Sequence, residues 1–348
     1  TSAFLYNGQY ADFLPKLLER IVEYDSEIVV FCFQEDVYPG NYLHLLLKQE
    51  MNNLNYDLFD SQRFLGVGKT SLKNLNNYDV TMRGLHTSVY IKDLVTFEEN
   101  SPYKKYYPKF FSPSLFRNKG GICIYITYRQ GENREEKTVA IINSHLQFDA
   151  NNLTNSVIQQ DLMLRQDSIN KQNELFNELY RQFILHMDIP NLSCIYAGDF
   201  NYRFNPVCNW SAARTSSEIF RLLNHFYFEN NNDDETLVEK EDYKRMFHEF
   251  VIKNDEYEQQ RTKKNIYLLN EGVENSGVTF PPTCKLNTKR VANKIAMNSY
   301  KYGKSDQRVP SWCDRILHKG LKCIEYDLFD VNNISLSDHI ALIAKFEV

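Results

Sequence analysis

The chain has 348 residues, a net charge of −5 and a pI of about 6.0, with 23 Tyr and 23 Phe. This acidic balance argues against a global basic surface for nucleic acid, and no apolar run approaches the length of a membrane span. Seven cysteines without a CxxC pair predict reduced thiols in a cytoplasmic protein. Patterned sequence begins at once after Thr1, so we expect a domain of a larger protein.

Helical and strand-like patterns are mixed along the chain without a strict βαβ rhythm. Apolar residues at helical spacing predict helices over 11–25, 157–185, 216–226 and 236–252. Apolar or alternating runs predict strands at 27–36, 85–93, 121–129, 138–149, 193–204 and 337–348. The polar segment 253–265 predicts a loop or a solvated helix face. Because nothing separates two units, we expect one α+β domain over residues 1–348.

Several strand-like runs end in, or enclose, polar residues that bind metals or transfer protons. These residues are Glu35, His145, Asp199 with Asn201, Asp314, and Asp338 with His339. Any one of them usually caps a strand or forms a turn. The strands of one sheet can nevertheless direct their ends to a single crevice, so the recurrence predicts one functional site.

The residue types at these ends favour hydrolysis assisted by a hard metal ion. Glu35 and Asp338 offer the oxygen ligands that Mg²⁺ prefers, and no Cys/His cluster has zinc spacing. Asp199 can accept a proton from water while Asn201 stabilises an oxyanion.

The segment RVPSWCDRIL (308–317) places a carboxylate, Asp314, on the strand face shared by Trp312 and Ile316. A buried carboxylate needs a partner. One interpretation is a structural salt bridge, and the other is that Asp314 orients His339.

Two stretches have the Cys-x5-Arg spacing of cysteine phosphatases, beginning at Cys123 and Cys284. That chemistry requires a phosphate-binding loop at a helix N-terminus. Cys123 lies inside an alternating strand and neither stretch contains an internal glycine, so we expect neither thiol to be the nucleophile.

Seven motifs in a fixed order resemble those of the type II inositol polyphosphate 5-phosphatases, within the endonuclease/exonuclease/phosphatase superfamily. They are FQED (33–36), RNKGG (117–121), NSHL (143–146), AGDFNYRF (197–204), VTFPPTCK (278–285), RVPSWCDRIL (308–317) and LSDH (336–339). The resemblance implies a four-layer α/β/β/α sandwich, in which helices flank two packed mixed sheets. It also implies Mg²⁺-dependent removal of the 5-phosphate from phosphoinositides, such as phosphatidylinositol 4,5-bisphosphate or 3,4,5-trisphosphate, or from soluble inositol polyphosphates.

The resemblance also implies a role for each matching residue. Glu35 is a metal ligand, and Asp338 lies at or near the metal. Asp199 activates water, Asn201, His145 and His339 contact the scissile phosphate, and Asp314 pairs with His339. The implied substrate-binding residues are Lys285, Arg308, Asn118, Lys119 and Arg203.

The chain departs from the family pattern at its first strand and around the 4-phosphate site. Leu5 stands where the family has an asparagine that helps to bind the metal, and Asn7 is the nearest replacement ligand. Cys284 stands in place of a tyrosine, and Asp306 replaces a basic residue. These changes leave the preferred phosphoinositide open.

Segment 101–121 mixes Lys104, Lys105, Lys109 and Lys119 with aromatic residues such as Tyr106, Tyr107, Phe110 and Phe111, a composition suited to an anionic membrane surface; a partly buried loop is the alternative. We therefore expect a monomeric cytoplasmic domain, peripheral at membranes, with no nucleic-acid partner. Two competing hypotheses are a metal-impaired phosphoinositide-binding module and a nuclease or sphingomyelinase-like phosphodiesterase of the superfamily.

Overall fold

The computed structural model describes most of the predicted core elements. The described residues are 10–38, 42–67, 82–92, 109–111, 119–130, 135–146, 158–204, 221, 242, 245–246, 248–250, 252–284, 290–291, 294–295, 310–329 and 338–347. None of the helices in these ranges is long and apolar enough to cross a membrane.

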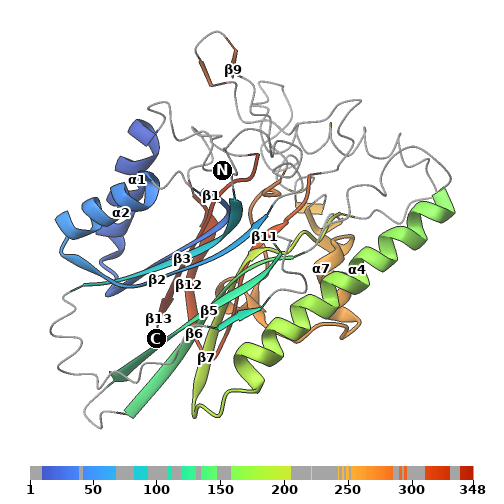
Figure 1. Cartoon of the computed structure of the whole chain (residues 1–348). Coiled ribbons are helices and arrows are strands. Elements are labelled where there is room, and N and C mark those ends of the chain that lie inside the picture. The colour runs from blue at the N-terminus through green and yellow to red at the C-terminus, as the bar shows by residue number, and fades with distance from the viewer. Residues whose placement is uncertain are drawn as a thin grey trace.

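Two β-sheets form the centre of the molecule (Figure 1). The first sheet has the order β1-β3-β2 and consists of β1 (Ile28–Tyr38), β3 (Met82–Lys92) and β2 (Tyr56–Val67). The second has the order β4-β5-β6-β7-β11-β8 and consists of β4 (Lys109–Phe111), β5 (Gly120–Gln130), β6 (Glu135–His145), β7 (Leu192–Asp199), β11 (Asp314–Lys319) and β8 (Asn270–Glu271). The second sheet is mixed, because β6 and β7 run parallel while the other pairs are antiparallel.

The two sheets pack face to face through alternate residues of apolar strands. On β5, Ile122, Ile124 and Ile126 pack with Val139 and Ile141 of β6. Residues of β3 complete this inter-sheet core from the other sheet: Leu85, Val89 and Ile91. Because side chains alternate along a strand, the residues between these positions face the opposite way, toward helices. Strands buried on both faces explain the continuous apolar runs in the sequence.

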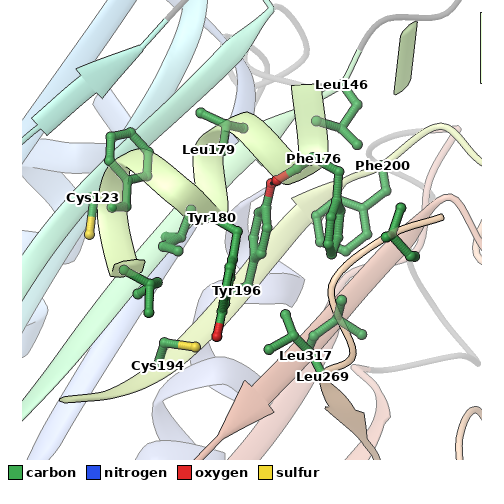
Figure 2. Close-up of a cluster of buried hydrophobic side chains, with 14 of the residues drawn as sticks. Cys123, Leu146, Phe176, Leu179, Tyr180, Cys194, Tyr196, Phe200, Leu269 and Leu317 are labelled. Carbon is green, nitrogen blue, oxygen red and sulfur yellow. The ribbon is translucent and has the colours of Figure 1, made fainter. Parts of the chain in front are cut away.

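Helices cover the outer face of each sheet, which gives four layers (Figure 1). Helices α1 (Tyr10–Tyr24) and α2 (Tyr42–Asn53) lie on the first sheet, where Ile21 and Met51 pack against Tyr90. The long helix α4 (Ile158–Tyr180) and the π-helical turn η4 (Arg181–Leu185) cover the second sheet. Figure 2 shows Phe176, Leu179 and Tyr180 of this helix against Tyr196 and Phe200. The predicted α+β four-layer sandwich is confirmed.

The remaining described elements are short or lie beside the second sheet. They are α7 (Glu256–Thr262), the 3₁₀ turn η5 (Val273–Asn275), β9 (Arg290–Val291), β10 (Lys294–Ile295), β12 (Lys322–Leu328) and β13 (Leu342–Glu347). β12 and β13 pair antiparallel and contribute Tyr326 and Leu328 to a further core around Trp312. β13 is shorter than the strand predicted over 337–348.

Helix α7 corrects the prediction for 253–265. Its residues Glu256, Tyr257 and Gln260 are buried, so the segment is neither a loop nor a fully solvated helix face. Arg165 of α4 pairs with Glu256, and Asn173 donates to Gln260 Oε1 at 2.9 Å. Polar pairing holds this helix in place, which a search for apolar periodicity misses. The predicted helices at 216–226 and 236–252 lie largely outside the described residues.

Candidate active site

Three of the predicted site residues lie side by side across the second sheet. The parallel register of β6 and β7 pairs His145 with Asp199, and the antiparallel register of β7 and β11 pairs Asp314 with Asp199. On the other side, Gly120 of β5 pairs with His145, which brings Lys119 to the same edge. Residues far apart in the sequence therefore lie close together, because these strand positions lie side by side at one edge of the sheet.

A glycine and a left-handed turn shape the end of β7. Gly198 has a φ of +153°, and a Cβ at this position would lie 2.0 Å from the backbone oxygen of Ser144. Only glycine allows so close an approach of β7 to β6 immediately before Asp199. Asn201 then adopts a φ of +57°, a conformation that asparagine tolerates better than most residues. Its backbone N–H donates to Asp199 Oδ1 at 3.0 Å, which fixes the carboxylate.

His339 reaches the site through a short segment that joins three parts of the chain. Cys284 forms isolated β-bridges with both Ser311 and His339. Thr283 accepts from Ile340 N at 2.8 Å through its carbonyl oxygen, and from Asp314 N at 3.2 Å through Oγ1. His339 Nδ1 consequently lies 2.8 Å from Asp314 Oδ2, with both side chains partly buried. Asp314 and His339 form the predicted carboxylate–imidazole pair.

The side chains of Asp199, Asp314 and His339 form a compact group of acid and imidazole donors. One ligand atom from each lies within 4.8 Å of the others. Two carboxylates and an imidazole are donors that divalent cations accept in proteins, and carboxylates suit the hard cations Mg²⁺ and Ca²⁺ in particular. The chemistry of this group therefore fits a divalent metal ion at this edge of the sheet.

Asp199 is held in its charged form. Burial raises the pKa of a carboxyl group, yet the pKa of Asp199 lies below its usual range because His145 hydrogen-bonds to it. The charges of His339 and Lys119 act in the same direction. His145 Nε2 lies 3.3 Å from Asp199 Oδ2 and also contacts Lys119 Nζ. The site thus combines a carboxylate with several cations, as expected for a site that binds an anionic substrate.

Arg203 is buried, and its guanidinium contacts the left-handed turn at Asn201. Its Nη2 donates to Asn201 Oδ1 at 2.8 Å, and its Nη1 donates to Cys284 Sγ at 3.4 Å. Asn201 Nδ2 in turn donates to the backbone oxygen of Leu146 at 3.0 Å. The family resemblance implies that Arg203 binds substrate; its contacts favour a role in positioning Asn201.

The two cysteines that begin the Cys-x5-Arg stretches have different surroundings. Cys123 lies within β5 and packs in the core under α4 (Figure 2), where a catalytic thiol has no access to substrate. Cys284 is also fully buried but borders the site. A hydrogen bond with Cys313 holds the pKa of Cys284 well below its usual range; burial opposes this effect, and the charges of His339 and Arg203 reinforce it.

The other predicted site residues are described in part or not at all. Asn7, Asn118, Lys285 and Arg308 lie outside the described residues, as does the side chain of Glu35. The backbone of Glu35 belongs to β1. Asp338 is partly buried and immediately precedes His339.

Two polar residues next to the site were not singled out from the sequence. Gln34 of β1 donates from Nε2 to Asn143 Oδ1 of β6 at 2.7 Å. Each lies within a motif that carries a predicted site residue, FQED for Glu35 and NSHL for His145. Their polarity inside apolar strands was the available signal.

Solved structures with this fold have unlike functions. The inositol polyphosphate 5-phosphatase domain of spsynaptojanin, in complex with inositol (1,4)-bisphosphate and calcium, is 17% identical, with a TM-score of 0.55 over 92% of this chain and 74% of that one. The Cimex nitrophorin ferrous NO complex is 14% identical, with a TM-score of 0.52 over 95% of this chain and 92% of that one. At these identities the likeness shows the fold alone, and the fold does not determine the chemistry.

Sequence comparisons give the family. A curated relative, type I inositol polyphosphate 5-phosphatase 1 of Arabidopsis thaliana, is 27% identical over 189 residues, which is 51% of this chain and 25% of the relative. The model of the endonuclease/exonuclease/phosphatase family 2 matches residues 7–345. The fold and site thus define a sandwich protein with an acid–imidazole centre at its strand ends. The chain belongs to the endonuclease/exonuclease/phosphatase family.

Proposed function

We propose that this chain catalyses the Mg²⁺-dependent hydrolysis of the 5-phosphate of phosphoinositides or soluble inositol polyphosphates. The observation that carries the proposal is the alignment of His145, Asp199 and Asp314 on neighbouring strands, with His339 bonded to Asp314. Such a group combines a carboxylate that can accept a proton with imidazoles that can contact phosphoryl oxygens.

The similar proteins support the choice of substrate. The Arabidopsis relative is named as an inositol polyphosphate 5-phosphatase, and the similar synaptojanin domain was solved with an inositol bisphosphate. The chain spans a quarter of the length of the Arabidopsis relative, so the identity of the phosphoester is part of the proposal.

We propose Glu35 and Asp338, with Asn7 in place of the asparagine that Leu5 replaces, as ligands of Mg²⁺. Among the described residues, the carboxylates of Asp199 and Asp314 are further oxygen donors, while His339 is engaged with Asp314. When bound, the cation supplies positive charge next to the phosphoryl oxygens. The similar synaptojanin structure holds calcium, which takes oxygen ligands of the same kind.

The side chains of the chain itself perform the proton transfer and hold the substrate. Asp199 accepts the proton of the attacking water as the water oxygen bonds to phosphorus and the bond from phosphorus to the inositol oxygen breaks. The leaving inositol oxygen takes up a proton from solvent. Asn201, His145 and His339 hydrogen-bond to the phosphoryl oxygens as the negative charge moves among them.

We propose that four residues select the substrate. The contact of Lys119 with His145 supports a role for Lys119 in phosphate binding. Lys285 and Arg308 are proposed to recognise the 4-phosphate, and Asn118, which comes shortly before β5 in the sequence, to contact the substrate. We further propose that residues 101–121 dock a monomeric, cytoplasmic catalytic domain on anionic membranes, and that nucleic acid is not a partner.

The experiment that tests this function measures phosphate release from inositol 1,4,5-trisphosphate with Mg²⁺ and again with EDTA. Asp199→Asn is the matched variant because it keeps the shape of the side chain and removes its charge. We expect turnover with Mg²⁺, none with EDTA, and a loss of at least about a hundredfold in kcat for D199N. Turnover of D199N at the wild-type rate would contradict the role of Asp199.

The main alternative is a phosphoinositide-binding module without turnover, which Leu5 motivates because leucine cannot bind Mg²⁺. In that case the folded protein binds the lipid but releases no phosphate at any Mg²⁺ concentration. Cleavage of abasic-site DNA or sphingomyelin would instead favour another phosphodiesterase of the superfamily.

A further inference from the structure

β1 contains a bulge next to the proposed metal ligand Glu35. In the ladder with β3, Phe33 pairs with His86 and Asp36 pairs with Gly84. Three steps along β1 therefore match two steps along β3, so one extra residue lies at Gln34–Glu35. An extra residue resets the alternation of side chains between the two faces of a strand, and it leaves backbone groups outside the regular ladder.

The side chain of Asn143 binds to both strands at this bulge. Asn143 is fully buried on β6, in the opposite sheet. Its Nδ2 lies 3.2 Å from Phe33 O, 3.0 Å from His86 O and 3.1 Å from Thr87 Oγ1. Its two hydrogens are thus shared among three acceptors, two of which are the carbonyl oxygens of the last ladder pair before the bulge.

The remaining polar atom of Asn143 binds the bulged residue itself. Oδ1 accepts from Gln34 Nε2 at 2.7 Å, and the same nitrogen lies 3.4 Å from Cys32 O. One buried amide therefore contacts the backbone before the bulge and the side chain within it. Because buried amides are costly without partners, this set of bonds favours a single arrangement.

Asn143 is close in sequence to a proposed catalytic residue, and its partner Phe33 is equally close to the proposed metal ligand. It precedes His145 by two residues on β6, just as Phe33 precedes Glu35 by two on β1. The neighbouring inter-sheet contacts, such as those of Ile141, are apolar and non-directional. The directional bonds of Asn143 are what can set the position of one sheet's bulge relative to the other sheet's catalytic end.

We propose that Asn143 is a positioning residue, which fixes the bulge of β1 and thereby the place of Glu35 relative to His145. The inference rests on the proposed function, since it concerns the metal ligand of that site. Residues that orient metal ligands typically change metal affinity by about 10–100-fold when they are altered. Asn143 is therefore expected to control metal binding without itself touching metal or substrate.

The test measures binding of Mn²⁺, a paramagnetic substitute for Mg²⁺, by the EPR signal of the free ion. The variants are Asn143→Leu, which keeps the volume and removes every hydrogen bond of this side chain, and Gln34→Leu, which removes the bonds of Gln34 to Asn143 and to Cys32 O. Thr138→Val is the matched control, because Thr138 is a buried residue of the same strand whose Oγ1 lies 3.0 Å from Thr127 Oγ1. Circular dichroism and the Tm in EDTA report whether each variant folds.

We expect the Kd for Mn²⁺ to rise by about tenfold or more in N143L, and to rise in Q34L, with wild-type affinity in T138V. Wild-type affinity in a folded N143L would overturn the inference while leaving the proposed function intact, as would equal weakening in T138V. If N143L does not fold, the affinity of Q34L decides. A wild-type protein that binds no Mn²⁺ would overturn the proposed metal-dependent function together with the inference.

Discussion

The pair of Asp314 and His339 determines the charge of an imidazole at the site. Burial lowers the pKa of His339, but the carboxylate of Asp314 and the sulfur of Cys284 outweigh it, so this pKa lies well above its usual range. A raised pKa means that His339 is protonated below that value and loses its charge only as the pH rises through it. The charged form is the one that best holds a phosphate.

Asp314→Asn should therefore change the pH dependence of catalysis. Removing the carboxylate lowers the pKa of His339, so the decline of kcat/KM on the basic side should move to lower pH by about 1–3 units. The measurement is a pH profile of kcat/KM for wild type and D314N. If the decline of kcat/KM at basic pH is unchanged in D314N, His339 is not the group whose titration causes it.

The variant Arg203→Met tests whether this buried cation binds substrate or positions Asn201. Loss of a hydrogen bond from a charged group costs about 1.5–3 kcal/mol, so Arg203→Met should lower kcat by about tenfold to a hundredfold. Because the guanidinium is turned toward Asn201 and Cys284, KM should change little. Steady-state kinetics separate the two roles: a raised KM with unchanged kcat would restore the substrate-binding assignment.

At the scale of elements, α7 and β11 are joined by a buried ion-pair network. Arg315 of β11 lies 2.5 Å from Asp255 and 2.8 Å from Glu271, and its guanidinium lies over the ring of Tyr257 at 4.3 Å. Asp255 also caps α7 by accepting from Glu258 N at 3.1 Å. This network holds the strand whose first residue is Asp314.

Arg315→Met should lower the stability of the protein strongly. It leaves two buried carboxylates without their cation, which typically costs about 3–5 kcal/mol of the free energy of unfolding. Urea unfolding measures the loss. Arg261→Met is the control, because it breaks a partly exposed ion pair on α7 and should cost about 0–1 kcal/mol. Equal stability of the two variants would contradict the importance of the buried network.

Some of these helices and strands could be predicted from the sequence, and others could not. Strands such as β5 and β6 were predicted because their apolar runs are long and uninterrupted. Helix α7 was misjudged because two of its three buried residues, Glu256 and Gln260, are polar and pair with α4, and apolar periodicity carries no trace of such pairs. The start of β11 at Asp314, rather than at Arg308, likewise depends on pairing with β7.

At the scale of the whole molecule, the convergence of the site depended on the topology. The polarity of His145, Asp199 and Asp314 marked them as candidates, but only the strand order β6-β7-β11 makes them neighbours. The family resemblance implied a four-layer sandwich and a shared site but no strand order. The bulge of β1 and its contact with Asn143 could not be predicted, because a register shift leaves no pattern in one sequence.

Membrane docking by residues 101–121 is a prediction from the sequence alone. Neutralising Lys104, Lys105 and Lys109 together should reduce hydrolysis of substrate in anionic vesicles, because each lysine near such a surface contributes about 1 kcal/mol of attraction. Hydrolysis of soluble inositol 1,4,5-trisphosphate should be unaffected. Equal losses on vesicles and on soluble substrate would refute a docking role.

We propose that the site releases the 5-phosphate, so the position of the released phosphate separates this function from the alternatives. Short-chain phosphatidylinositol 4,5-bisphosphate would be incubated with the protein and Mg²⁺, and the product assigned by the position of its remaining phosphate. We expect phosphatidylinositol 4-phosphate, formed only when the metal is present. Phosphatidylinositol 5-phosphate, or no product from the folded protein at any Mg²⁺ concentration, would contradict it.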